Sequence, residues 1–188
     1  MYSGKMHGVS MKIFRMAGIK ILAVFILSAL LSGCVHNPAD KYITGKPDKN
    51  DMADLNRYFV QKDRERIQNY IERKSLTMTE SPTGLWYQII KEGSGKTFTD
   101  NDKIVMEYSC SLLDGTVCYT SEKFGNKELV LGRSQMEPGM NQGLRMLSPG
   151  AQAILIMPPF LAYGLIGDGK MIPSRAVIVY SVKILQTE

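Results

Sequence analysis

The alternation of apolar and polar residues between Lys103 and Leu112 is the strongest structural signal in this chain. In the stretch KIVMEYSCSL, every second residue from Ile104 onward is apolar or aromatic if the cysteine is counted as apolar. A period of two places such side chains on one face of a strand. The segment is therefore predicted to be a half-buried β-strand whose inner face belongs to the core.

Further strand signals surround this segment and are separated by turn residues. The stretch AVIVYSVKIL at 176–185 is rich in β-branched residues, which favour strands. The expected strands are residues 85–89, 103–112, 117–120, 128–131, 151–157 and 176–185. Residues 139–147 instead carry apolar side chains at helical spacing. Many antiparallel strands with one short helix predict an α+β domain over residues 81–188, in which a curved antiparallel sheet wraps the helix.

A helical arm is expected in front of this domain, within residues 51–80. Between Leu55 and Leu76, apolar residues recur on either side of the charged stretch QKDRER. This arm can pack on its own domain, or it can form a dimerisation or client-cradling surface, and a homodimer through the arm is expected in the second case. Residues 34–50 hold two Pro and one Gly without periodicity, which is typical of a tether.

The first 33 residues have the pattern of a signal peptide. A short basic stretch, residues 11–20, precedes the apolar run ILAVFILSALL, which is too short to span a bilayer. The following LSGC resembles a bacterial lipobox, and this resemblance implies that a lipid is attached to Cys34 after cleavage before it. The alternative is an ordinary secretory signal with a chance cysteine. The lipobox resemblance implies a lipid-anchored protein of the cell envelope. Because no Asp directly follows Cys34, resemblance to sorted lipoproteins favours the outer membrane over the inner one, and we expect the protein to face the periplasm.

Composition excludes several classes of function. Only two histidines, His7 and His36, occur, and neither lies in a patterned segment, which excludes a His-based triad or a His-ligated metal site. Most of the net charge of +5 arises in residues 1–33, which hold four basic residues and no acidic one. The expected domain is balanced in charge, so nucleic acid is not an expected partner. Gly95-Lys96-Thr97 lacks the remaining glycine of a phosphate loop and is interpreted as a turn.

Several short motifs occur in a fixed order along residues 81–188. They are GLWY at 84–87, LDGTV at 113–117, PG at 138–139, PPFLAYG at 158–164 and MIP at 171–173. Their order and spacing resemble the FKBP-type peptidyl-prolyl cis-trans isomerases. With the lipobox and the arm, the chain is most similar to the lipoprotein form associated with gliding motility in Bacteroidetes. The resemblance implies an FKBP-like fold, isomerisation of X-Pro bonds in cell-envelope polypeptides, and no cofactor or metal.

The resemblance also assigns roles to individual residues. Tyr163 and Tyr108 fall at the positions of the family's catalytic tyrosines. The Tyr163 hydroxyl is expected to donate a hydrogen bond to a substrate carbonyl. The residues that fall at substrate-binding positions are Cys118, Tyr119, Met136, Glu137, Met140, Met171, Ile172 and Tyr180. Of these, Glu137 is expected to contribute its backbone N–H. Catalysis of this kind needs no covalent step, because an apolar pocket favours the twisted, less dipolar amide.

Three departures from the family pattern affect this pocket. Met140 replaces the usual Trp of the pocket floor, and Cys118-Tyr119 replace a Phe-Asp pair, so the carboxylate expected to partner Tyr108 is missing. Lys127 or Glu128 stands near another usual aromatic. These changes predict a shallower pocket with reduced activity. They also support an alternative function, a non-catalytic FKBP-like binding or chaperone module of an envelope machine.

Cys110 and Cys118 flank the turn at Asp114-Gly115. A three-residue loop at 113–115 sets the two cysteines directly opposite each other on paired strands. A disulfide between them is one alternative, because an oxidising periplasm permits it. Two small apolar thiols in the core are the other.

Overall fold

The structure is a computed structural model that describes residues 49–185 of the 188-residue chain. The signal peptide expected at 1–33, the lipidation site at Cys34 and all but the last two residues of the expected tether lie outside the described residues. Within residues 49–185, no helix has the length and apolar character needed to cross a membrane.

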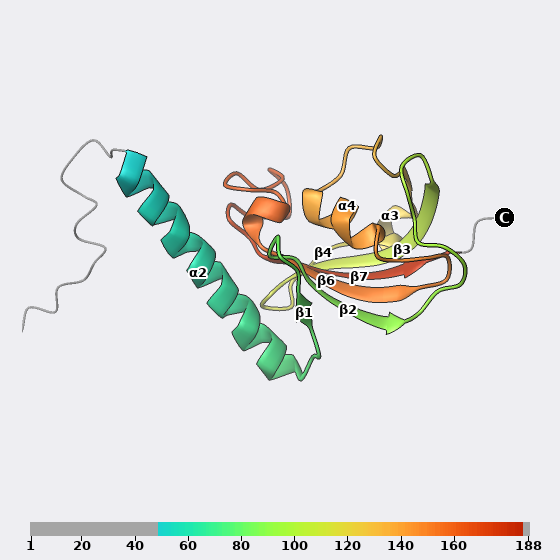
Figure 1. Cartoon of the computed structure of the whole chain (residues 1–188), viewed down its shortest axis with the longest axis horizontal. Helices are drawn as coiled ribbons and strands as arrows, with labels where there is room; N and C mark the ends of the chain where they lie inside the picture. The colour runs from blue at the N-terminus through green and yellow to red at the C-terminus, as the bar shows by residue number, and fades with distance from the viewer. Residues whose placement is uncertain (1–48, 186–188) are drawn as a thin grey trace, which may run out of the picture. The chain divides into compact units, whose positions relative to one another are not determined.

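A seven-stranded antiparallel sheet curves around one short helix (Figure 1). The strands are β1 (Thr79–Glu80), β2 (Trp86–Lys91), β3 (Lys103–Leu112), β4 (Val117–Thr120), β5 (Lys127–Val130), β6 (Gln152–Met157) and β7 (Ile178–Ile184). The helices are α2 (Lys49–Lys74), α3 (Ser121–Phe124), α4 (Pro138–Leu144) and the 3-10 turn η2 (Pro159–Leu161). The strand order is β1-β2-β6-β7-β3-β4, and β5 also pairs with β3. The predicted α+β class and the sheet around a helix are confirmed.

The predicted alternation of β3 is confirmed. Ile104, Met106 and Cys110 are buried, and Tyr108 and Leu112 are half-buried on the same face. The strand pairs along its length with β7, while β5 and β4 share its other edge. β3 is therefore a central strand that pairs with three other strands of the sheet.

Helix α4 packs against β6 at unusually short range. A Cβ atom added at Gly143 would lie 2.5 Å from Leu155 Cδ1, and one added at Gly139 would lie 2.5 Å from Met157 Sδ. These contacts are shorter than real Cβ contacts allow, so a larger residue at either position requires the side chain of Leu155 or Met157 to move. Met140 and Leu144, also on α4, are fully buried in the same cluster.

The β3–β4 hairpin differs from the sequence expectation at the cysteines. Cys110 pairs with Tyr119 and Ser111 with Val117, so Cys118 is an extra residue on β4. The expectation that Cys110 lies directly opposite Cys118 is wrong, because this bulge shifts the register. Both thiols are free and buried, which matches the core-thiol alternative. Burial raises the pKa of the Cys110 thiol to about 12.

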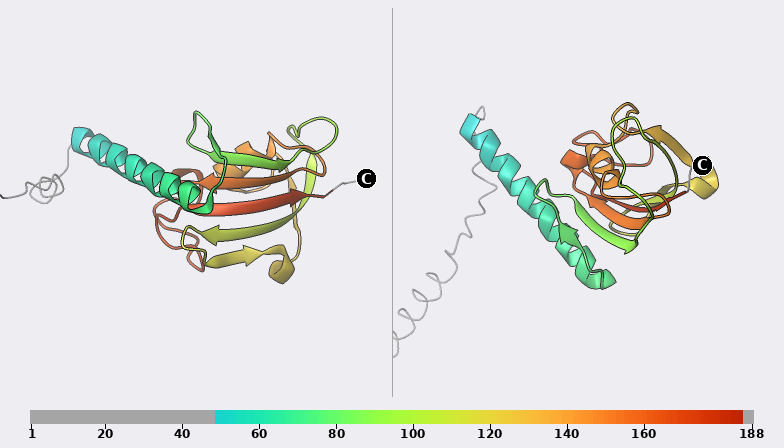
Figure 2. Two further views of the ribbon diagram at one scale, coloured as in Figure 1. Left: turned by 90° about the horizontal axis from the view of Figure 1, so that it is seen from below. Right: turned by 45° about the vertical axis from the view of Figure 1, so that its right-hand side comes forward.

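The C-terminal half of α2 packs on the outer face of the sheet. Ile67 is 1% exposed and lies in a cluster with Trp86, Ile156 and Val179. Ile156 and Val179 alternate along their strands with residues of the inner core, so this cluster lies on the face opposite α4 (Figure 2). The structure therefore shows the first of the two alternatives for the arm, which is packing on its own domain. Met52, Tyr58 and Val60, nearer the start of α2, are exposed.

One arginine links α2 to the segment between β6 and β7. Arg175 donates to the Asp63 carboxylate at 3.0 Å, and its Cζ lies 3.9 Å from the centroid of the Phe59 ring. Asp63 is 5% exposed and also pairs with Arg66 at 3.4 Å. Burial raises the pKa of Asp63, and the two arginines oppose this effect. The arm is thus fastened to the loop as well as to the sheet.

Replacing Ile67 with Ala should lower the free energy of unfolding by about 2–4 kcal/mol, because it removes a buried side chain between α2 and the sheet. Denaturant unfolding followed by circular dichroism measures this change. Val60→Ala, at an exposed position of the same helix, is the control and should have little effect. Equal destabilisation by the two substitutions would contradict the docking of α2.

Candidate functional site

A cavity of about 260 Å³ lies among tyrosines from several strands and the segment between β6 and β7. It is lined by Tyr108, Tyr119, Lys127, Tyr163, Asp168, Lys170 and Tyr180. We call this cavity the tyrosine pocket. A second cavity of about 300 Å³ shares Lys127 and Tyr163 with it and is also lined by Met136 and Glu137. The structure thus brings six of the predicted site residues to two adjoining cavities.

The other four predicted site residues do not line either cavity. Met140, Cys118 and Ile172 are buried in the same cluster as Tyr180, whereas Met171 is 41% exposed. The thiol of Cys118 donates to the Met171 carbonyl at 3.5 Å. Their roles in substrate binding remain predictions.

Local geometry holds Tyr163 at the pocket. Directly before it, η2 turns the chain, and the Gly164 N–H donates to the Pro159 carbonyl at 2.8 Å. The Gly164 carbonyl in turn accepts from the Arg175 N–H at 3.2 Å. Gly164, the residue after Tyr163, is therefore fixed by backbone hydrogen bonds through both its N–H and its carbonyl.

The carboxylate of Glu137 is the main polar group that the sequence analysis missed. Glu137 is 6% exposed, and its Oε1 accepts hydrogen bonds from the hydroxyls of Tyr163 and, at 3.0 Å, Tyr180. Its Oε2 has no hydrogen bond and lies 3.9 Å from Lys127 Nζ. The sequence pattern assigned only the backbone N–H of Glu137 to the site. Its side chain is instead the acceptor at the centre of a tyrosine network.

Lys127 lies near a position at which the family pattern has an aromatic residue. Its Nζ lies 5.8 Å from the Tyr108 ring centroid and 6.0 Å from the Tyr180 centroid. A cation at this distance is attracted by the ring faces. The ammonium therefore lies in the tyrosine pocket, drawn by two rings and by Glu137.

The pocket hydroxyls are held as donors. Burial raises the pKa of Tyr163 and of Tyr180, and the neighbouring Glu137 carboxylate raises both further. Burial is also the main cause of the raised pKa of Tyr108. All three side chains stay protonated at neutral pH, so they can donate a hydrogen bond but cannot serve as bases.

A second carboxylate reaches the pocket from the loop before β7. Asp168 accepts from the Tyr119 hydroxyl and from the backbone N–H groups of Lys170 at 2.9 Å and Ile172 at 2.8 Å. The sequence predicts that the carboxylate partner of Tyr108 is missing, because Cys118-Tyr119 replaces a Phe-Asp pair. The structure supplies a carboxylate from another element, and it partners Tyr119, not Tyr108.

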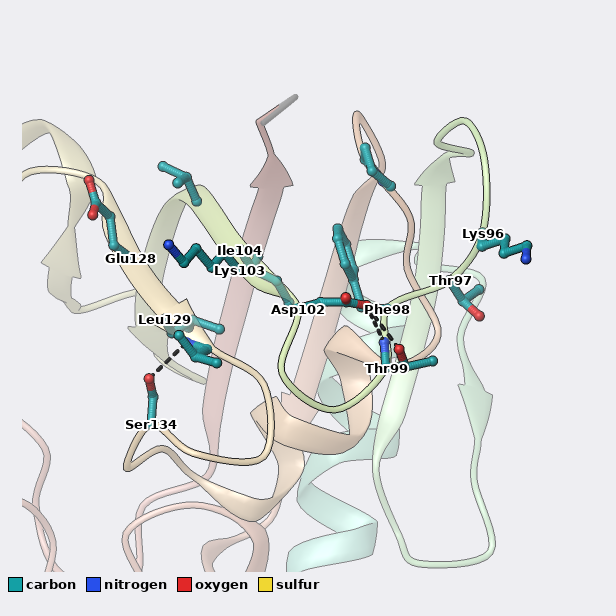
Figure 3. A pocket seen from close by; sticks show the side chains of 13 residues that line it. Lys96, Thr97, Phe98, Thr99, Asp102, Lys103, Ile104, Glu128, Leu129 and Ser134 are labelled. Carbon is teal, nitrogen blue, oxygen red and sulfur yellow. Dashed lines mark hydrogen bonds between the residues drawn. The ribbon is translucent and has the colours of Figure 1, made fainter. Parts of the chain in front are cut away.

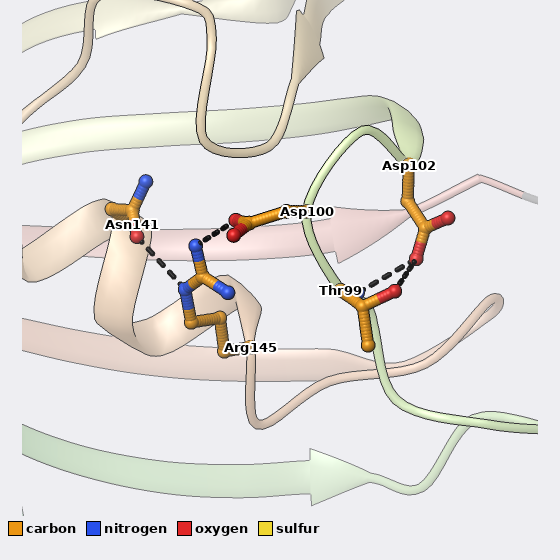
Figure 4. Close-up of polar contacts among 5 residues, drawn as sticks. All are labelled: Thr99, Asp100, Asp102, Asn141 and Arg145. Carbon is orange, nitrogen blue, oxygen red and sulfur yellow. Dashed lines mark hydrogen bonds and ion pairs between the residues drawn. The ribbon is translucent and has the colours of Figure 1, made fainter.

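A larger cavity, of about 890 Å³, lies away from these tyrosines, beside β5 and the loop before β3 (Figure 3). Lys96 and Thr97 line it, but the chain after them is irregular and not helical, which agrees with a turn and not a phosphate loop. The adjoining turn is closed by Asp102, which accepts from the Thr99 N–H at 2.7 Å, and by a contact between Arg145 and Asp100 (Figure 4). Among residues 49–185, no cluster of three or more metal-ligating side chains occurs.

Residues 95–185 match a protein-family model described as FKBP-type peptidyl-prolyl cis-trans isomerase. This match covers just under half of the chain. The chain is 33% identical over 108 residues to the isomerase FkpA of Escherichia coli K12, and 32% identical over 106 residues to the isomerase Mip of Chlamydia trachomatis. These matches cover 57% and 56% of this chain but only 39% and 42% of the two relatives.

Solved structures show the same fold. The crystal structure of AtFKBP13 superposes with a TM-score of 0.56 and 25% identity, covering 60% of this chain and 99% of that one. The N-terminal domain of FKBP42 from Arabidopsis thaliana superposes with a TM-score of 0.54 and 23% identity, covering 60% of this chain and 92% of that one. The predicted FKBP-like fold is therefore confirmed for this domain.

In this FKBP domain, Asp168→Asn should lower the pKa of Tyr119 from about 12 toward its ordinary value of 10, because the hydrogen bond to the carboxylate is the largest cause of the shift. NMR titration of the tyrosine ring carbons measures the pKa, and Tyr119→Phe identifies the signal. Asp102→Asn removes a carboxylate from a distant turn and should leave this pKa unchanged. An unchanged value in Asp168→Asn would contradict the Tyr119–Asp168 bond.

Proposed function

We propose that this protein catalyses cis-trans isomerisation of X-Pro peptide bonds in polypeptides of the cell envelope. The supporting observation is the convergence of Tyr108, Tyr163 and Tyr180 on one pocket of an FKBP domain. The curated relatives FkpA and Mip are named as peptidyl-prolyl cis-trans isomerases, which favours the same activity here.

The chemistry suits a pocket of aromatic walls and fixed donors. Rotation about an X-Pro bond crosses a barrier of about 18–20 kcal/mol, because amide resonance is lost in the twisted state. The twisted amide is less dipolar, so surroundings that exclude water favour it over the planar ground state. A tyrosine hydroxyl that donates to a substrate carbonyl fixes the peptide in place. Each 1.36 kcal/mol of such selective stabilisation gives about tenfold in rate.

Removal of a pocket wall tests this proposal. Tyr108→Ala should lower kcat/KM for an X-Pro peptide by about tenfold or more, because the prolyl ring loses an apolar contact surface. The assay uses the full chain in detergent solution. Tyr87→Ala, a half-buried tyrosine on β2 outside the pocket, is the matched control and should retain activity.

Absence of turnover in the folded wild-type protein would refute the enzymatic function. The second candidate, a non-catalytic binding or chaperone module, is favoured by the presence of the Lys127 ammonium beside the rings of Tyr108 and Tyr180. In that case the protein suppresses aggregation of unfolded polypeptides, and Tyr108→Ala weakens this effect without any turnover being present.

We also propose that the protein is a lipoprotein of the outer membrane, facing the periplasm and anchored at Cys34. This proposal, like the link to gliding motility in Bacteroidetes, is supported by the lipobox and arm of the sequence. Its partners are then proline-containing clients and the membrane. A homodimer through the exposed start of α2, which carries Met52, Tyr58 and Val60, belongs to the same proposal.

Cys34→Ala should abolish incorporation of labelled fatty acid and release the protein from the membrane fraction of a bacterial host, since acyl burial holds such an anchor at about 0.8 kcal/mol per CH₂. Cys118→Ala is the control and should incorporate label normally, because Cys118 is buried in the core. Labelling that persists in Cys34→Ala would overturn the anchor.

A further inference from the structure

The hydroxyl of Tyr163 already has an acceptor inside the protein. A tyrosine hydroxyl carries one proton and can donate one hydrogen bond. In the structure that bond goes to Glu137 Oε1. If the isomerase function proposed above holds, a substrate carbonyl that accepts a hydrogen bond from Tyr163 must first replace Glu137 as the acceptor.

We propose that Glu137 is a positioning residue that limits activity by competing with substrate for the Tyr163 hydroxyl. Hydrogen bonds to a charged acceptor are shorter and about twice as strong as those between neutral groups. A substrate carbonyl is a neutral acceptor, so the internal bond is the stronger of the two. The resting pocket therefore withholds its donor from substrate.

Glu137 is fixed in place, which makes this competition unavoidable. Its side chain is 5% exposed and also accepts from Tyr180 at 3.0 Å, and Tyr180 is itself 1% exposed. Glu137 directly precedes Pro138, the first residue of α4, whose inner face is buried. The carboxylate cannot turn toward solvent without leaving a buried hydroxyl unpaired.

Lys127 reinforces the resting arrangement. Its ammonium lies 3.9 Å from Glu137 Oε2 and within about 6.0 Å of the ring centroids of Tyr108 and Tyr180. The charge of Glu137 thus holds a cation beside two aromatic walls of the pocket. The lysine side chain is 32% exposed, so it can move outward once this charge is removed.

Glu137→Gln tests the competition, because the amide oxygen keeps the shape and the acceptor but is neutral. We expect kcat/KM for an X-Pro peptide to rise by about fivefold. We further expect Tyr163→Phe to lower kcat/KM by less than about twofold in the wild-type background but by about fivefold in the Glu137→Gln background. Glu92→Gln, an exposed position after β2, removes the same charge and should change neither value.

The same Tyr163→Phe factor in both backgrounds would overturn the proposal, since a purely structural role of Glu137 gives no coupling to this hydroxyl. Peptide affinity, measured by NMR titration of the four proteins, separates this result from failure of the isomerase function. If no variant shows turnover, the isomerase function fails. A gain in affinity in Glu137→Gln that is lost in the double variant still supports the competition, and unchanged affinity refutes it.

Discussion

The close approach of α4 to β6 is the contact on which the pocket depends. Gly139 and Gly143 leave room for Met157 and Leu155, and a larger residue at either position would displace one of these side chains. Glu137 directly precedes this helix, so the depth at which α4 packs also determines where the Glu137 carboxylate lies. One packing contact therefore both closes the core and places the buried acid of the pocket.

The pocket is more polar than the family resemblance implies. Two carboxylates, Glu137 and Asp168, accept hydrogen bonds from Tyr163 and Tyr119, and Lys127 lies among the rings. The hydroxyls of Tyr163 and Tyr119 are thereby oriented before any ligand arrives. Such order lowers the entropic cost of binding, but it also means that a ligand must replace existing bonds and not merely fill an empty space.

The sheet could be predicted from sequence because its signal is local. The alternation in β3 and the β-branched residues of β7 each reveal a buried face without knowledge of their partners. The bulge at Cys118 depends on how two strands pair, and no local pattern shows it. The acids of the pocket were missed for the same reason, since Glu137 and Asp168 meet tyrosines 26 and 49 residues away along the chain.

The link between α2 and the loop before β7 makes the arm more than a cover for the sheet. Arg175 holds Asp63 and Phe59 of the helix, and its own backbone N–H holds Gly164, next to Tyr163. The guanidinium and the backbone of one residue therefore connect the arm to the glycine beside the pocket tyrosine.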